Sequence, residues 1–119
     1  MTASESVLVL GSTSVTSWGH DQLERIVVEA RSRGLGLVGM DLAERHEGPG
    51  RVRGEKAWFD ELLVADVDDA ASCVAAVRGR DDIAAVLTIR ELSVLPVAVV
   101  ARELGLRAAD SGETQKCGQ

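Results

Sequence analysis

The chain has 119 residues, of which 45% are hydrophobic and 27% charged, and its formal net charge is −6. This length suits a single domain spanning 1–119. The acidic balance argues against a surface that binds nucleic acid or an anionic membrane, because phosphate groups attract Lys and Arg. Only 3% of the residues are aromatic, so we expect a core of Val, Leu, Ala and Ile, as in buried parallel strands covered by Ala-rich helices.

The two cysteines, Cys73 and Cys117, are too few and too far apart to indicate a metal site or a disulfide framework. The N-terminus carries no basic-plus-apolar signal, and no apolar run approaches the length that spans a bilayer. We therefore expect a cytoplasmic protein.

Apolar runs and helical patterns alternate along the chain. Residues 6–11 form an apolar run bounded by Gly, which is typical of a strand buried on both faces. Residues 20–33 repeat apolar side chains at helical spacing and end at Gly34. The next expected elements are a strand at 35–41, a polar loop at 42–55, a strand near 62–66 with or without a helical turn before it, a helix at 67–79, a strand at 83–88 and a helix at 92–105.

This alternation predicts an open, Rossmann-like α/β fold, with a mostly parallel sheet of about four strands and helices on both faces. The residues after 106 contain no fifth apolar run, and we expect 1–5 and about 107–119 to be extended or frayed. Ligands of such sheets bind beyond the carboxyl ends of the strands. The residues expected there are 11–19, Asp41, Asp66 and 88–91.

The loop "GSTSVTSWG" (11–19) looks like a phosphate-binding loop but matches no common fingerprint. Seven residues separate Gly11 from Gly19, and His20 stands where a P-loop needs Lys. A dinucleotide fingerprint needs more glycines, although Asp41 lies where a ribose-binding acid would. A phospho-receiver domain needs an acidic pair after the first strand, which is absent here.

Nucleophilic catalysis finds little support in this loop. Ser14 or Ser17 with His20 could form a pair, but residues this close in one loop rarely hold catalytic geometry. His20 is more simply the first residue of the helix, and His46 falls in the polar loop with no evident partner. What remains is a rim of hydroxyls beside the helix start, which either binds an anion or caps the helix; its members are Ser12, Thr13 and Ser17.

Residues 85–117, "AVLTIRELSVLPVAVVARELGLRAADSGETQKC", resemble the end of the N-terminal domain that precedes the catalytic region in ATP-grasp carboxylate–amine ligases, such as biotin carboxylase, carbamoyl-phosphate synthase and bacterial amino-acid ligases. The shared pattern is an apolar strand followed by Thr88 and Glu91, an Ala-rich helix ending in "LGL", and a small-residue turn that leads to Cys117. "VLVLGSTSVTSWG" and "LLVADVDDAASCVAAV" are similar to the first loop and to a strand–helix junction of the same domain, so the resemblance covers nearly the whole chain.

The resemblance implies a supporting role in a reaction that activates a carboxylate as an acyl phosphate, which an amine then attacks. In such ligases this domain forms one wall of the cleft. Carried over by position, Glu91 could hold a substrate amine and Arg90 a carboxylate. The substrate-binding residues that the resemblance implies are Gly11, Ser12, Thr13 and Glu91, with Thr88 and Arg90 as further candidates.

Members of this family usually continue from the Cys into Arg-Asp-Lys, the entry to the ATP-grasp region, whereas this sequence ends in "KCGQ". We therefore expect no catalytic residue and no cofactor in this chain; ATP and Mg²⁺ are expected only with the ATP-grasp region, in cis or as a separate chain. The ends of the first and fourth strands should leave a concave face for that partner. Two alternatives stay open: a free-standing Rossmann-like module that binds a nucleotide or small anion, and a non-catalytic remnant that is structural or forms a homodimer.

Overall fold

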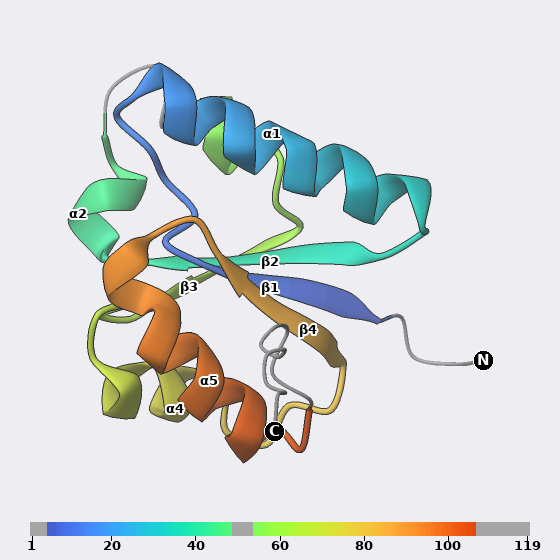
Figure 1. Cartoon of the computed structure of the whole chain (residues 1–119), viewed down its shortest axis with the longest axis vertical. Coiled ribbons are helices and arrows are strands. Elements are labelled where there is room, and N and C mark those ends of the chain that lie inside the picture. Colours follow the sequence, from blue (N-terminus) through green and yellow to red (C-terminus); the bar gives the residue numbers. More distant parts are fainter. Residues whose placement is uncertain (1–4, 49–53, 107–119) are drawn as a thin grey trace.

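In the computed structural model, four parallel strands form one sheet with helices on both faces (Figure 1). The structure describes residues 5–48 and 54–106. The predictions for 1–4 and 107–119, including Cys117, fall outside these ranges. No helix within them combines the length and the apolar character that a membrane span requires.

The strands are ordered β3-β2-β1-β4, and every neighbouring pair is parallel. The register places Leu10 beside Met40 on one side and beside Thr88 on the other. The predicted open parallel α/β sheet of four strands is therefore confirmed. The strands are β1 (Ser6–Leu10), β2 (Gly36–Asp41), β3 (Glu61–Val64) and β4 (Ile83–Thr88).

Helix α1 (Ser17–Ser32) covers one face of the sheet, and α4 (Ala70–Val77) and α5 (Val94–Glu103) cover the other (Figure 1). The central strand β1 is buried throughout because its side chains alternate between these two layers. Val7 and Val9 pack in the cluster that contains α1, whereas Leu8 and Leu10 pack in the cluster that contains α4 and α5.

Two shorter elements stand next to the carboxyl ends of the strands. Helix α2 (Ala43–His46) follows β2, and the 3₁₀ helix η1 (Glu91–Ser93) connects β4 to α5. The prediction of a continuous loop at 42–55 is therefore wrong, and a helical turn at 54–56 precedes β3. His46 has a partner after all: it is buried, and its Nε2 lies 3.1 Å from the carbonyl oxygen of Leu63.

Helix α1 begins at Ser17 and not at His20 as predicted, because Thr16 caps it. The Thr16 side chain is the helix cap, with its Oγ1 accepting a hydrogen bond from the Gly19 N–H at 3.0 Å. The helices expected at 67–79 and 92–105 also exist but begin later, at Ala70 and Val94. Pro96 lies in the first turn of α5, where its missing N–H is tolerated.

Candidate functional site

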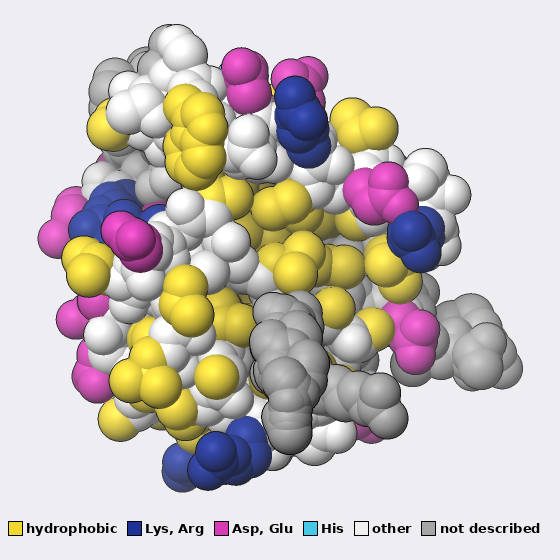
Figure 2. Space-filling view, in the orientation of Figure 1, with side chains coloured by type: hydrophobic (Ala, Val, Ile, Leu, Met, Phe, Trp, Pro, Cys, Tyr) yellow, Lys and Arg dark blue, Asp and Glu magenta, His cyan; other side chains and the backbone are white. Residues whose placement is uncertain are grey.

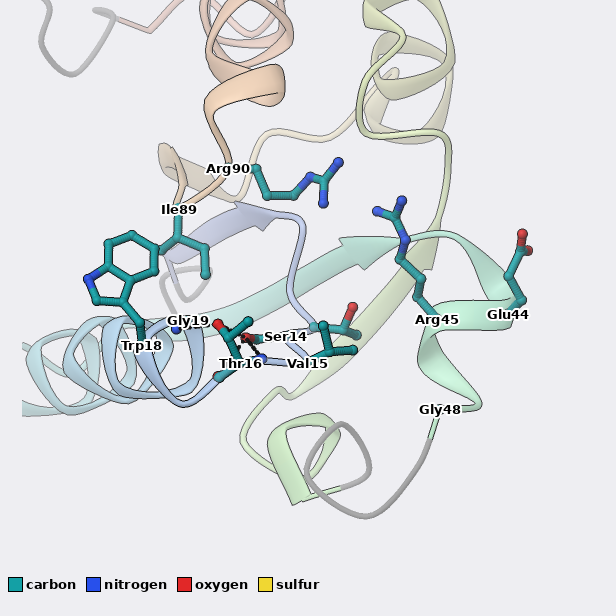
Figure 3. A pocket seen from close by; sticks show the side chains of 11 residues that line it. Ser14, Val15, Thr16, Trp18, Gly19, Glu44, Arg45, Gly48, Ile89 and Arg90 are labelled. Atoms are coloured by element: carbon teal, nitrogen blue, oxygen red, sulfur yellow. Dashed lines mark hydrogen bonds between the residues drawn. The ribbon is translucent and has the colours of Figure 1, made fainter.

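The strand order reverses between β1 and β4, since β2 follows on one side of β1 and the chain later returns to form β4 on the other. Parallel α/β sheets bind ligands at such a point. A hollow of about 500 Å³ opens there, between the loop after β1, helix α2 and the segment after β4 (Figure 3). Its polar side chains are Thr13, Ser14, Thr16, Glu44, Arg45 and Arg90.

The three residues predicted to form an anion-binding rim do not present a row of free hydroxyls to the hollow. Thr13 Oγ1 donates a hydrogen bond to Asp41 Oδ2 at 2.7 Å. Ser12 is buried and its Oγ packs against Gly39 of β2, so it does not reach the hollow. The capping role belongs to Thr16, while Ser17 is the first residue of α1.

Asp41 holds two residues that line the hollow, Thr13 and Arg45, by hydrogen bonds. It is fully buried, and its carboxylate accepts hydrogen bonds from the Thr13 hydroxyl at 2.7 Å, the Leu42 N–H at 2.8 Å and Arg45 Nη1 at 3.1 Å. Three donors satisfy most of what two carboxylate oxygens can accept. The carboxylate therefore holds the loop and Arg45 in place, and does not serve as the ribose acceptor considered for this position.

Arg90 follows β4 and is fixed by Thr88, the last residue of that strand, and by Asp68. The Thr88 hydroxyl donates to the carbonyl oxygen of Leu10 at 2.8 Å and accepts the Arg90 N–H at 2.9 Å. The Arg90 Nη2 donates to both oxygens of Asp68, at 3.0 and 2.9 Å. This hydrogen bond holds the pKa of Asp68 below its usual value. Arg90 Nε is buried and has no hydrogen-bond partner among the described residues.

Arg45 and Arg90 thus line one hollow from two different elements, with their guanidinium groups on the same side of it (Figure 3). Each is anchored through one nitrogen by one acid, Asp41 or Asp68. A guanidinium carries five N–H donors, so each retains donors for a ligand. Paired guanidinium groups suit a carboxylate or phosphate. Among the described residues, no three His, Cys, Asp or Glu side chains are placed to hold a metal ion.

The structure brings together some of the predicted substrate-binding residues and separates others. Thr13 and Arg90 line the hollow. Thr88, Arg90 and Glu91 line an adjacent depression with Trp18. Gly11 lies beneath the Arg90 side chain, and Ser12 is turned away.

Sequence reasoning missed Arg45 and the true partner of His20. The spacing of Asp41 and Arg45, four residues apart, is a helical ion-pair signal, but it counts only where a helix is expected. His20 Nδ1 lies 2.9 Å from Glu55 Oε2, in place of the serine pairing considered for it.

An apolar strip adjoins the hollow, formed by Trp18, Leu92, Val94 and Leu95. Their exposed fractions are 64%, 72%, 60% and 70%. Large apolar side chains gathered at the surface mark interaction sites more often than single ones do. Figure 2 shows hydrophobic side chains at several places on the face between α1 and α5, and a second hollow on the molecule is lined in part by Val7, Ile26, Ala85 and Leu87. The strip comes from the first turn of α1, from η1 and from the start of α5.

No family model matches the chain, and no curated protein matches it. In structure, the chain is similar to phosphoribosylglycinamide synthetase from Anaerococcus prevotii, with a TM-score of 0.64 and 12% sequence identity. The match covers 88% of this chain but 23% of that one. At this identity the similarity shows a shared fold.

Proposed function

We propose that this chain is the N-terminal, substrate-side domain of an ATP-grasp ligase that forms amide or peptide bonds through an acyl phosphate. The observation that carries the proposal is the pair Arg45 and Arg90, which line one hollow at the switch point of the sheet. The resemblance of residues 85–117 to ATP-grasp ligases supports the family, and the fold shared with a phosphoribosylglycinamide synthetase is consistent with it.

Arg45 and Arg90 bind the carboxylate of the acid substrate in this proposal. Their anchoring acids hold the two guanidinium groups before the substrate arrives, which lowers the entropic cost of binding. Glu91 is exposed beside Trp18 and offers a carboxylate to the substrate amine.

The reaction itself needs groups that we assign to another region. A carboxylate oxygen attacks the γ-phosphorus of ATP and ADP leaves; the amine nitrogen then attacks the acyl carbon and inorganic phosphate leaves. The described residues contain neither a P-loop nor a cluster for Mg²⁺. We therefore assign phosphoryl transfer to an ATP-grasp region, in cis or as a separate chain, and the apolar strip to the contact with it.

The test supplies an ATP-grasp region, in cis or as a separate chain, and follows ADP release with a panel of carboxylates and amines. Arg45→Gln and Arg90→Gln should each raise KM for the acid by about tenfold or more, as expected for a lost hydrogen bond to a charged group. Arg102→Gln, at the exposed end of α5, is the matched control.

Two results would contradict the proposal. One is an unchanged KM in both hollow variants. The other is tight binding of ATP or NAD by this chain alone in calorimetry, which would favour a free-standing nucleotide-binding module.

A further inference from the structure

We infer that Glu55 and His20 are positioning residues. They hold the loop after β1 through contacts made outside the hollow that this loop lines. They form a latch, defined here as the contacts among Glu55, His20 and Ser14. Neither Glu55 nor His20 lines the hollow, whereas Ser14 does. The effect of the latch on ligand binding rests on the proposed function, but its effect on the loop does not.

Glu55 is a fully buried acid whose two oxygens have different partners. Oε1 accepts the backbone N–H of Ser14 at 2.7 Å, and Oε2 lies 2.9 Å from His20 Nδ1. These partners are 41 and 35 residues away in the sequence. The carboxylate therefore joins the segment before β3 to both the loop and the first turns of α1.

The contact between Glu55 and His20 determines which of the two is the hydrogen-bond donor. An ionised carboxylate only accepts hydrogen bonds, so His20 Nδ1 must carry the hydrogen, in the neutral or in the protonated ring. A buried carboxylate is costly unless donors surround it. The ring of His20 also packs against Trp58, with centroids 4.9 Å apart. Trp58 and Glu55 thus hold the imidazole from the same segment.

The contacts continue from Glu55 to the wall of the hollow. Ser14, whose N–H Glu55 accepts, donates through its Oγ to the carbonyl oxygen of Thr16 at 3.0 Å and accepts the Thr16 N–H at 3.1 Å. Thr16 in turn caps α1 through Gly19. Ser14, Thr16 and Gly19 all line the hollow. Loss of the buried carboxylate should therefore change the shape of the hollow without removing any group that faces it.

The latch also has a consequence for what the hollow can bind. Loops before helices commonly offer backbone N–H groups to anions. Here the Ser14 N–H is already bound by the carboxylate of Glu55. The Ser14 N–H is therefore not offered to an anion in the hollow, whereas the side chains of Arg45 and Arg90 line it and can share a carboxylate.

The test measures hydrogen exchange of the Ser14 amide by NMR, and the affinities for acetate and inorganic phosphate, in wild type, four latch variants and one control variant. Glu55→Ala and His20→Ala remove one side of the latch. Glu55→Gln can still accept the Ser14 N–H, and its amide can donate to His20 Nδ1 in the other tautomer. His20→Asn keeps a donor close to the position of Nδ1. Glu29→Ala, an exposed acid of α1, is the control.

Glu55→Ala should speed exchange of the Ser14 amide by about tenfold or more and weaken acetate binding. Glu55→Gln and His20→Asn should keep most of the slow exchange and most of the acetate affinity of the wild type. Should Glu55→Ala fail to fold, His20→Ala takes its place, because His20 is partly exposed. Unchanged exchange in the Ala variants would overturn the latch, and faster exchange with unchanged acetate affinity would overturn its positioning role. Faster exchange in a protein that binds neither anion would keep the latch and contradict the proposed function.

Discussion

The side chain of Arg90 lies directly over Gly11, so closely that a Cβ atom on Gly11 would overlap Arg90 Cδ. Gly11 also has a φ of 77°, in the region where a side chain is strained. Two independent constraints therefore favour glycine at this position. The same Arg90 stem carries the guanidinium group to Asp68 and to the hollow, which links the backbone of the first loop to the segment after β4.

Gly11→Ala should lower the free energy of unfolding by about 1 kcal/mol or more and weaken acetate binding, because Arg90 must leave its place. Urea unfolding and an NMR titration measure the two effects. Gly79→Ala is the matched control, since Gly79 has a φ of 85° but no atom within 4 Å of its would-be Cβ. If Gly11→Ala loses no more affinity than Gly79→Ala, Arg90 is not the anion-binding group.

Acid should weaken the protein partly through Arg80, which joins Glu61 of β3 to Asp82 just before β4. Arg80 donates to Glu61 at 2.9 and 2.9 Å and to Asp82 at 3.0 and 2.8 Å. The hydrogen bond from Arg80 lowers the pKa of both carboxyl groups. Groups with a lowered pKa in the fold stabilise it above the ordinary carboxyl pKa, about 4, and lose this contribution as the pH falls through the lowered values.

Arg80→Met should therefore destabilise the protein at pH 7 by less than about 1 kcal/mol per pair, because both pairs are partly exposed. The difference between wild type and variant should shrink as the pH is taken down toward 3. Urea unfolding at a series of pH values measures it. A difference that does not change with pH would show that Arg80 stabilises the fold through packing of its stem and not through these charges.

The thiol of Cys73 should be unreactive in the folded protein. Burial raises its pKa to about 11, with a smaller contribution from the negative charge of Asp66. At neutral pH, the thiolate fraction is then about 300-fold lower than for a free cysteine with a pKa near 8.5. In a Cys117→Ser variant, labelling by iodoacetamide should be at least that much slower than in urea. Fast labelling of the folded variant would mean that α4 opens locally.

Strands β1, β2 and β4 could be predicted because each is a short apolar run with a clear boundary, and β1 is buried on both faces as such a run indicates. The bounds of β3 could not, since the sequence predicts a strand near 62–66 and β3 spans Glu61–Val64. Helix α2 could not be predicted, since "AERH" is too short and polar to show a helical period. Asp41 was recognised as a residue of the site, but not its role. Its partner Thr13 and the Glu55 partner Ser14 lie 28 and 41 residues away. Bonds over such separations exist only once the sheet has formed, so no local pattern encodes them.

The apolar strip should contribute to association and not to the stability of this domain. Leu95 is 70% exposed, so its burial adds little to folding, and a surface substitution away from special contacts changes stability by about 0.5 kcal/mol or less. Leu95→Gln should leave the unfolding midpoint of the isolated chain almost unchanged. It should weaken binding to the ATP-grasp region by roughly tenfold, if that surface is buried there at about 25 cal/mol per Å².

The matched control for Leu95→Gln is Val28→Gln, because Val28 is 62% exposed on α1 and is not part of the strip. Calorimetry with the separate ATP-grasp region, or the KM for ATP where both regions form one chain, compares the two variants. If Leu95→Gln and Val28→Gln weaken binding to the ATP-grasp region equally, the effect comes from general surface polarity and not from this strip. A loss confined to Leu95→Gln, with the same unfolding midpoint, would identify the strip as the docking face. Sedimentation of the isolated chain separates the remaining case: a dimer that Leu95→Gln dissociates would show that a second copy covers the strip.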